Sequence, residues 1–390
     1  MNYKISHPNK IINCEINLPA SKSISNRLLI IQALSNKTIT IENISKSEDT
    51  INLKKGIFAS NKNIDINHSG TAFRFLTSYL SSIKNKEYIL TGSKRIQQRP
   101  IKELVDILVQ MGANINYINK KGFAPLKIKG RTLRGGSYQI SGKISSQFIT
   151  SLLLIAPTLE NGIKLQIDGS LVSAPYVYMT LKIMKEFGVE SEWKDNTICI
   201  KKQCYLSKVT SVESDWSAAS FWFQIAALSS NCNIILNGLN DRSIQGDKKC
   251  RYFFDRLGVS SKFLNKSLVL TKNKKVYSNL NYNLVKYPDL FQPLACTHFA
   301  KNIKAKFSGT DSLKIKESNR LQVVADELQK LNTNKSIDTY NDHRMAMSFA
   351  PLCLSYGELQ INNIEVVKKS YPNFWIDLKK AGFKISPVID

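Results

Sequence analysis

The chain has 390 residues, of which 43% are hydrophobic, and its formal net charge is +25. This length and hydrophobic content favour a globular protein of two or three domains and argue against a disordered chain. The basic residues are spread along the chain without an aromatic-interleaved basic tract, so we expect small anionic substrates as partners and no nucleic acid. A basic nucleic-acid-binding repeat protein stays open as an alternative, because of the charge.

Membrane and metal sites have little support in the sequence. The most apolar stretches, Phe148–Pro157 and Phe221–Leu228, are too short to span a bilayer, so we expect a cytoplasmic protein with no membrane partner. The seven cysteines form no Cys-x-x-Cys pair, and the four histidines form no His-Glu-x-x-His motif. We therefore expect reduced thiols and no metal.

Six similar segments organise the chain. In each, a polar cluster precedes an apolar run of helical length: Ser21–Leu34, Ser69–Leu80, Ser145–Pro157, Asp215–Leu228, Pro288–Ala300 and Asn341–Leu354. A second amphipathic segment follows each one: Glu48–Gly56, Pro100–Gly112, Pro175–Gly188, Gly246–Gly258, Ser318–Leu331 and Pro372–Gly382. Short β-like runs lie between them, among them Thr38–Ile44, Ile163–Ile167 and Glu358–Ile361. The pattern predicts six repeats that each combine strands with two helices.

Three of these repeats precede Glu213 and three follow it. We therefore expect two similar domains, residues 20–213 and residues 1–19 with 214–390. The first helix of each repeat is apolar nearly all round, which predicts a buried helix that is exposed to solvent only at its polar start. If the helix starts converge between the domains, their unpaired N–H groups favour an anionic ligand in a cleft.

The first helix start, Ala20–Arg27, illustrates the two interpretations that such a segment allows. Ser21 or Ser23 is a candidate helix cap, and Lys22 and Arg27 are cations within the first turns. A phosphate or carboxylate at a helix N-terminus suits this composition. An ordinary capped helix with solvated cations fits equally well.

The other helix starts carry similar chemistry, and each also has a plain structural interpretation. Gly70 would let a ligand approach the backbone, or would simply occupy a turn. Arg99 and Arg344 suit carboxylate and phosphate but are equally able to form structural ion pairs. Asp289 and Glu317 are candidates for proton transfer, although Asp289 would also serve as a helix cap. Arg74, which lies inside its helix, looks structural.

Ordered motifs along most of the chain resemble the enolpyruvyl transferases, and within them the branch that uses shikimate 3-phosphate. The resemblance covers Leu18–Arg27, Ser69–Leu76, Gln98–Ala113, Ser145–Pro157, Ser173–Val189, Val212–Ser220, Pro288–Asp289, Lys314–Leu328, Tyr340–Phe349 and Lys369–Pro372. It implies an α/β (α+β) fold, an inside-out α/β barrel of two domains, each built from three βαβαββ-type repeats with buried helices. It also implies a monomer that uses no cofactor, with the active site in the cleft between its domains.

The implied reaction transfers the carboxyvinyl group of phosphoenolpyruvate to the 5-hydroxyl of shikimate 3-phosphate and releases phosphate. The resemblance assigns the catalytic roles to Lys22, Asp289 and Glu317. It implies shikimate 3-phosphate binding by Lys22, Ser23, Arg27, Ser145, Ser146, Gln147, Ser173, Tyr176, Asp289, Ser312 and Lys316. It implies phosphoenolpyruvate binding by Lys22, Gly70, Arg99, Gln147, Arg320, His343, Arg344 and Lys369.

Three positions depart from the family's usual pattern. His68 stands where Asn, Leu or Gly is usual, Ser312 where many members have Asn, and Asn319 where Asp is commoner. The nearest alternative is the sister enzyme that transfers the same group to UDP-N-acetylglucosamine. A further alternative is a catalytically inactive relative that serves as a binding module. The presence of Lys22, Asp289 and Glu317 argues against it.

Overall fold

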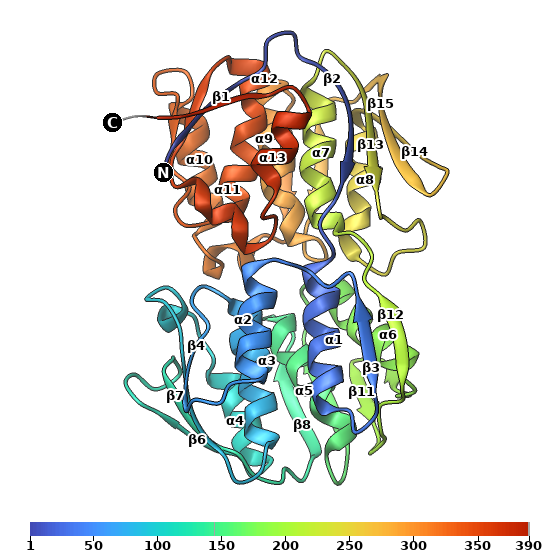
Figure 1. Cartoon of the computed structure of the whole chain (residues 1–390), viewed down its shortest axis with the longest axis vertical. Coiled ribbons are helices and arrows are strands. Elements are labelled where there is room, and N and C mark those ends of the chain that lie inside the picture. The colour runs from blue at the N-terminus through green and yellow to red at the C-terminus, as the bar shows by residue number, and fades with distance from the viewer. Residues whose placement is uncertain (144, 389–390) are drawn as a thin grey trace. The chain divides into compact units, whose positions relative to one another are not determined.

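The computed structural model describes residues 1–143 and 145–388, which form two compact units. The first, the continuous unit, is Ser21–Val212. The second, the discontinuous unit, combines Met1–Ala20 with Glu213–Asp390. Each unit has its helices gathered inside and its strands toward the outside (Figure 1).

The continuous unit alternates helices and short strands. Its helices are α1 (Lys22–Leu34), α2 (Glu48–Ile57), α3 (Gly70–Ser82), α4 (Lys102–Gln110), α5 (Ser146–Ile155) and α6 (Ala174–Glu186), with 3₁₀ turns η1 (Ile96–Gln98) and η2 (Ala156–Thr158). Its strands are β3 (Ile39–Glu42), β4 (Asn63–Asp65), β5 (Glu87–Thr91), β6 (Asn114–Tyr117), β7 (Leu126–Lys129), β8 (Gly136–Ser141), β9 (Ile163–Asp168), β10 (Glu192–Lys194), β11 (Thr197–Ile200) and β12 (Lys208–Ser211).

The discontinuous unit repeats this alternation. Its helices are α7 (Trp216–Leu228), α8 (Cys250–Asp255), α9 (Phe291–Ala300), α10 (Arg320–Lys330), α11 (His343–Phe349), α12 (Cys353–Tyr356) and α13 (Phe374–Lys380). Its 3₁₀ turns are η3 (Gly246–Lys249), η4 (Pro288–Leu290), η5 (Asp311–Ile315), η6 (Ala350–Leu352) and η7 (Ile364–Lys369). Its strands are β1 (Tyr3–Ser6), β2 (Ile11–Asn17), β13 (Asn231–Asn237), β14 (Leu257–Leu264), β15 (Ser267–Val276), β16 (Leu280–Asn283), β17 (Ala305–Ser308), β18 (Ser336–Ile337), β19 (Leu359–Ile361) and β20 (Lys384–Pro387).

Among the described residues, the four-stranded sheets share one pattern of strand pairing. The four-stranded sheets have the orders β4-β5-β7-β6 and β10-β11-β9-β8 in the continuous unit, and β14-β15-β13-β2 and β18-β19-β1-β20 in the other. In each, one edge pair is parallel and the other two pairs are antiparallel. The two-stranded sheets, β12-β3 and β16-β17, are parallel. Neighbouring parallel strands must be joined by a crossover connection, and α3, α5, α9 and α11 each lie in one such connection. Apart from the 3₁₀ turns η1 and η2, the predicted βαβαββ order is seen in β4-α3-β5-α4-β6-β7 and in β8-α5-β9-α6-β10-β11.

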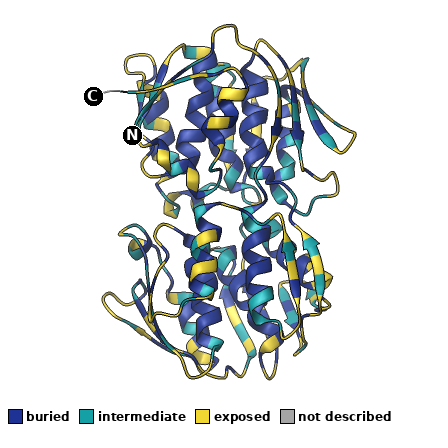
Figure 2. Ribbon diagram, viewed as in Figure 1, coloured by how far each residue is buried: buried dark blue, intermediate teal, exposed yellow. Residues whose placement is uncertain are grey.

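The first helix of each repeat is buried almost all round, as the sequence predicts (Figure 2). In α7, which the structure describes throughout, every residue except Ser217 is buried. In α5, likewise described throughout, the exception is Gln147. Both exceptions lie in the first turn, so the polar start is the accessible part of a helix that otherwise packs inside its unit.

Side-chain caps fix several of these helix starts. The Ser21 hydroxyl accepts a hydrogen bond from the Ile24 amide at 3.4 Å. The Asp215 carboxylate accepts one from the Ala218 amide at 3.1 Å, and Asp342 caps α11 through the Arg344 amide at 2.9 Å. Each cap satisfies an amide that has no partner within its helix.

Three predicted helices differ from the structure. The segment predicted to begin at Pro100 forms helix only from Lys102. Gly258 does not end the fourth repeat's second helix, because it already lies in β14. The first helix predicted for the sixth repeat, Asn341–Leu354, is broken where Pro351, in η6, separates α11 from α12, since proline cannot donate the helical hydrogen bond. None of the described helices is long and apolar enough to span a membrane.

Candidate active site

The predicted site residues divide between the two units. The continuous unit holds Lys22, Ser23, Arg27, Gly70, Arg99, Ser145, Ser146, Gln147, Ser173 and Tyr176, and the discontinuous unit holds Asp289, Ser312, Lys316, Glu317, Arg320, His343, Arg344 and Lys369. Most of them lie at or next to the start of a helix. The two groups are described separately below.

Lys22 opens α1 and forms an ion pair with Asp49 of α2. Its Nζ lies 2.9 Å from Asp49 Oδ2, and the two side chains are 17% and 3% exposed. The contact between α1 and α2 brings these residues together. Because the carboxylate is buried, it holds the lysine head group in one place while part of the side chain stays accessible.

Arg27 lies deeper in α1 than the sequence suggests. Its Nε donates to Thr180 Oγ1 at 2.8 Å, its Nη1 to the Ser23 carbonyl at 2.7 Å, and its Nη2 to the Tyr176 carbonyl at 3.0 Å. Burial lowers the pKa of Arg27 to about 10. The guanidinium thus ties α1 to α6, and it also fixes Tyr176, whose ring centroid is 5.9 Å from Arg27 Cζ.

Gly70 is the first residue of α3 and is packed against two arginines. A Cβ at this position would lie 2.3 Å from Arg99 Nη1 and 3.3 Å from Arg74 Nη1. Arg74 Nη1 donates to the Gly70 carbonyl at 3.1 Å, and its Nη2 donates to the Pro100 carbonyl at 3.2 Å. Arg74 therefore has the structural role expected for it, and the missing side chain of Gly70 leaves room for the Arg99 guanidinium.

The start of α5 presents the predicted run of neutral polar groups. Ser145 is the N-cap and accepts a hydrogen bond from the Gln147 amide at 3.3 Å, while Ser146 is buried. Gln147 Nε2 donates to Thr71 Oγ1 at 3.1 Å, which joins the starts of α3 and α5. Ser173, the N-cap of α6, has the left-handed backbone angle φ 57°, which is strained for a serine.

Arg320 is the centre of the group in the discontinuous unit. Its Nε lies 2.8 Å from Asp342 Oδ2, its Nη1 3.0 Å from Asp289 Oδ1 and its Nη2 2.9 Å from Glu317 Oε2. The side chain is 2% exposed, and the carboxylates raise its pKa above the ordinary arginine value even though burial opposes this. These contacts hold α10, α11 and η4 together at one point.

Asp289 also contacts Arg344, whose side chain is only 7% exposed. Arg344 Nη2 lies 3.1 Å from Asp289 Oδ2, and Arg344 Nη1 donates to the Asp289 carbonyl at 2.8 Å. Burial alone would raise the pKa of Asp289, but Arg344, Lys316 and Arg320 outweigh it and hold the pKa well below the ordinary value. Asp289 is therefore ionised at neutral pH and 19% exposed.

Glu317 bridges Arg320 to Lys369 of η7. Lys369 Nζ lies 2.8 Å from Glu317 Oε1, and the two side chains are 7% and 15% exposed. His343, the first residue of α11, is buried with Nδ1 3.7 Å from Asp342 Oδ1. Ser312 in η5 and Lys316, which ends η5, are partly exposed. The structure thus brings Asp289, Glu317, Arg320, Arg344 and Lys369 into one network.

Several members of these groups were not predicted. They are Asp49, Thr150 and Thr180 in the continuous unit and Ser217, Asp247 and Asp342 in the discontinuous unit. Asp342 lies in the predicted segment Asn341–Leu354, but its 2.8 Å contact with Arg320 depends on how α10 and α11 pack. Asp49 stands in the first turn of α2, which is a weak signal, because acidic residues are common there for dipole reasons alone.

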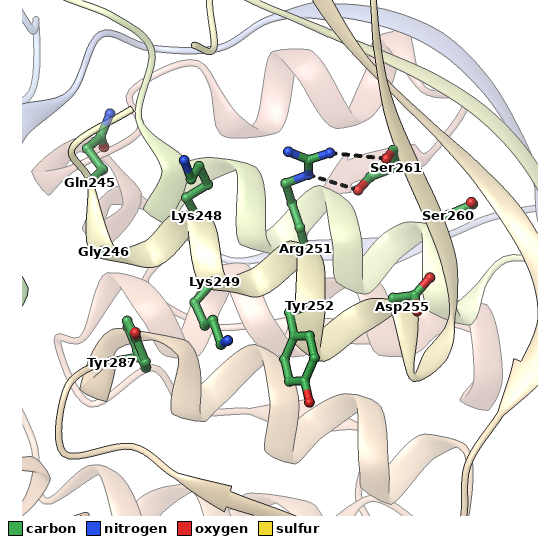
Figure 3. Close-up of a pocket in the computed structure, with 10 residues that line it drawn as sticks. All are labelled: Gln245, Gly246, Lys248, Lys249, Arg251, Tyr252, Asp255, Ser260, Ser261 and Tyr287. Carbon is green, nitrogen blue, oxygen red and sulfur yellow. Dashed lines mark hydrogen bonds between the residues drawn. The ribbon is translucent and has the colours of Figure 1, made fainter. Parts of the chain in front are cut away.

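A pocket of about 550 Å³ lies elsewhere on the discontinuous unit, and none of the predicted residues lines it (Figure 3). Its cations already have protein partners. Arg251 Nη1 lies 2.7 Å from Asp241 Oδ1, and Lys248 Nζ donates to the Asp241 carbonyl at 2.8 Å. Lys249 Nζ lies 4.0 Å from the Tyr252 ring centroid.

Among the described residues, no group of three or more His, Cys, Asp or Glu side chains is arranged to hold a metal ion. The candidate site contains carboxylates, ammonium and guanidinium groups, hydroxyls and amides. The cations suit anionic oxygens, and the carboxylates suit a hydroxyl donor.

Comparisons with known proteins identify the family. The family model for EPSP synthase (3-phosphoshikimate 1-carboxyvinyltransferase) matches residues 7–57 and 52–378. A 3-phosphoshikimate 1-carboxyvinyltransferase of Bacteroides fragilis (strain YCH46) is 44% identical over 407 residues and covers 99% of both chains. Another, from Colwellia psychrerythraea, is 33% identical and covers 95% of this chain and 97% of its own.

The fold has a close counterpart among solved structures. An EPSP synthase from Acinetobacter baumannii matches with a TM-score of 0.77 at 20% identity and covers 99% of this chain and 100% of its own. This likeness confirms the predicted α/β fold class. Together with the family model and the two relatives, it shows that the chain belongs to the EPSP synthase (3-phosphoshikimate 1-carboxyvinyltransferase) family.

Proposed function

We propose that this protein transfers the enolpyruvyl group of phosphoenolpyruvate to the 5-hydroxyl of shikimate 3-phosphate, in the biosynthesis of aromatic compounds. The observation that carries the proposal is the network of Asp289, Glu317, Arg320, Arg344 and Lys369, which places guanidinium and ammonium groups around two partly exposed carboxylates. Its residues are those that the family resemblance assigns to the reaction.

The reaction has two stages. In the first, the 5-hydroxyl oxygen of shikimate 3-phosphate bonds to C2 of phosphoenolpyruvate, the hydroxyl proton leaves and C3 gains a proton. In the second, the bond between C2 and the phosphate oxygen breaks and C3 loses a proton, which gives the enol ether and inorganic phosphate. The protein must therefore orient one hydroxyl, move a proton at one carbon and neutralise a departing phosphate.

Asp289 suits the hydroxyl. Because Arg344, Lys316 and Arg320 keep its pKa low, it is a strong hydrogen-bond acceptor but a weak base as it stands. We assign it to orienting the 5-hydroxyl, and to taking its proton only as the new C–O bond forms. Glu317, which also contacts Arg320 and Lys369, is assigned to proton transfer at the methylene carbon.

Phosphoenolpyruvate carries a carboxylate and a phosphate, and the cations match it. We assign its binding to Lys22, Gly70, Arg99, Gln147, Arg320, His343, Arg344 and Lys369. Lys22, held by Asp49, is the candidate donor to the bridging oxygen of the departing phosphate. Arg320 contributes chiefly by holding the network together, because its Nε, Nη1 and Nη2 all donate to carboxylates.

Shikimate 3-phosphate requires phosphate donors, hydroxyl partners and a face for its ring. We assign its binding to Lys22, Ser23, Arg27, Ser145, Ser146, Gln147, Ser173, Tyr176, Asp289, Ser312 and Lys316. The starts of α1, α5 and α6 supply backbone amides and hydroxyls of the kind that bind phosphate. The location of both substrates between the two units stays a prediction, as do the monomeric state and the cytoplasmic location.

Phosphate release from phosphoenolpyruvate tests the function directly. We expect release with shikimate 3-phosphate and none with UDP-N-acetylglucosamine, and the enol ether product should form in equal amount. Release with the nucleotide sugar alone would establish the sister activity instead. Tight, salt-dependent binding of DNA without turnover would favour the nucleic-acid-binding alternative.

A further inference from the structure

Four side chains of the discontinuous unit form a linear chain of contacts that leads away from the candidate site. Asp289 Oδ2 lies 3.1 Å from Arg344 Nη2, which donates to Ser217 Oγ at 2.7 Å. Ser217 Oγ in turn donates to Asp247 Oδ2 at 2.5 Å. The four residues come from η4, α11, α7 and η3. Neither Ser217 nor Asp247 is among the residues that the family resemblance assigns.

The direction of the hydrogen bonds follows from the donors available. A guanidinium only donates, so the Ser217 oxygen must accept from Arg344. The single Ser217 proton is then left for the Asp247 carboxylate. Ser217 is the partly exposed residue at the start of the buried helix α7, and Asp247 is 5% exposed. The buried carboxylate thus fixes the serine rotamer, and the serine fixes one edge of the Arg344 guanidinium.

We propose that Asp247 is a positioning residue for Arg344 and acts through Ser217. The proposal rests on the proposed function, in which Arg344 binds phosphoenolpyruvate. Arg344 Nη2 is shared between Ser217 Oγ and Asp289 Oδ2, and Arg344 Nη1 donates to the Asp289 carbonyl, so Asp289 and the Ser217–Asp247 pair together hold the guanidinium. Without the Ser217 contact, Arg344 keeps its charge but loses the orientation that a bidentate contact with a carboxylate or phosphate needs.

Protonation of Asp247 should weaken this arrangement. Burial, with smaller contributions from Asp289 and Asp215, raises the pKa of Asp247 to about 7 against the opposing effects of Arg344 and the Ser217 hydrogen bond. The Cys250 thiol of α8 also faces Asp247. Below neutral pH the protonated carboxyl becomes a donor and competes with Arg344 for the Ser217 oxygen. The positioning effect should therefore fade as the pH falls through about 7.

Steady-state kinetics of two variants test the proposal at pH 8. Asp247→Ala and Ser217→Ala are each expected to raise KM for phosphoenolpyruvate about tenfold, the loss typical of one hydrogen bond to a charged group. KM for shikimate 3-phosphate should change less than about twofold. The double variant should be no worse than either single variant, because both changes break the same chain. Asp241→Ala, which removes a mostly exposed partner of Arg251, is the matched control and should leave both KM values unchanged.

Other results would overturn the proposal. An equal rise in both KM values, or a double variant whose effect is the product of the single effects, would mean that the two residues act only on the general fold. If the alanine variants fail to fold, the Asp247→Asn variant tests the proposal instead, because its amide oxygen can still accept the hydrogen bond from the Ser217 hydroxyl. This variant should keep a near-normal KM at pH 8, and the ratio of its KM to the wild-type KM should fall between pH 8 and pH 6. A constant ratio would refute the proposal. Absence of turnover in the wild type would instead refute the proposed function.

Discussion

Replacing Arg320 by glutamine should strongly destabilise the discontinuous unit. The change removes one cation that contacts Asp342, Asp289 and Glu317 at 2.8 to 3.0 Å. Asp342 is 0% exposed, so without Arg320 its carboxylate is buried and has lost its main charge partner. Glutamine reaches only about as far as Arg320 Nε, so its amide can still donate toward Asp342, but the charge and the contacts of Nη1 and Nη2 with Asp289 and Glu317 are lost.

The structure sets the size of this effect. Removing one partner of a buried ion pair destabilises a protein by about 3 to 5 kcal/mol, whereas a pair near the surface contributes about 1 kcal/mol or less. The Asp342 pair is of the first kind, while Asp289 and Glu317 are 19% and 15% exposed. We therefore expect a loss of about 3 to 5 kcal/mol at pH 7.5.

The loss should also depend on pH. Arg344, Lys316 and Arg320 together lower the folded-state pKa of Asp289 against the effect of burial. A lowered pKa contributes stability that is present above the unfolded pKa and is lost as the pH falls through the folded pKa. The variant loses part of this contribution, so its difference from the wild type should stay nearly constant down to about pH 4.5, above the ordinary aspartate pKa of 3.8, and become smaller at pH 3.

Urea unfolding followed by tryptophan fluorescence measures this loss. Trp216, Trp222 and Trp375 are buried in the discontinuous unit, so the signal reports mainly that unit. Arg251→Gln is the control, because Arg251 pairs with Asp241, which is 63% exposed, and should change the unfolding free energy by less than about 1 kcal/mol. If Arg320→Gln behaves like this control, or if its effect is the same at pH 3 and pH 7.5, the reasoning is wrong.

The remaining predictions concern activity and stability at single positions. Asp289→Ala should lower kcat at least about 10²-fold and change KM less, because it removes the acceptor of the reacting hydroxyl; a purely KM effect would contradict this. Gly70→Ala should raise KM for phosphoenolpyruvate, because the new Cβ would lie 2.3 Å from Arg99 Nη1; an unchanged KM would mean that Arg99 has no role in binding. Arg27→Ala should mainly weaken shikimate 3-phosphate binding and also lower the melting temperature, since its guanidinium joins α1 to α6; calorimetry and KM measurements check both. Asp247→Asn should be more stable than the wild type by up to about 4 kcal/mol above pH 7 and equally stable below pH 4. The reason is that the pKa of Asp247 is raised from 3.8 to about 7, chiefly by burial, so the ionised carboxylate destabilises the folded wild type at high pH, and asparagine cannot ionise. Urea unfolding at both pH values tests this.

Much of the fold was predictable because its signals are local. A capping serine or aspartate followed by an apolar run specifies a helix start within a few residues, as Ser21, Ser145 and Asp215 illustrate. The repeats could be recognised because each one shows the same signals again. Local signals were less reliable where a second helix was short, as in α8, since β14 begins two residues after that helix ends.

The identities of the site residues could be predicted from the sequence, but the contacts between them could not. The family resemblance named Arg320 and Lys22, yet no local pattern joins Arg320 to Asp342 or Lys22 to Asp49. The degree of burial of Arg27 was also beyond prediction, because its partner Thr180 lies 153 residues away in the sequence. Such partners depend on how the repeats pack against each other.

β1 and β2 belong to the discontinuous unit, and this limits how early that unit can fold during synthesis. β2 pairs with β13, and β1 pairs with β19 and β20, so that His7 Nε2 and the Ala381 carbonyl oxygen, 374 residues apart, lie 3.2 Å from each other. During synthesis these first strands emerge long before their partners exist, whereas all of Ser21–Val212 is available to fold earlier. The continuous unit can thus be complete while β1 and β2 still present unpaired edges. The unit that holds Asp289 and Arg320 therefore cannot be complete until almost the whole chain has been synthesised.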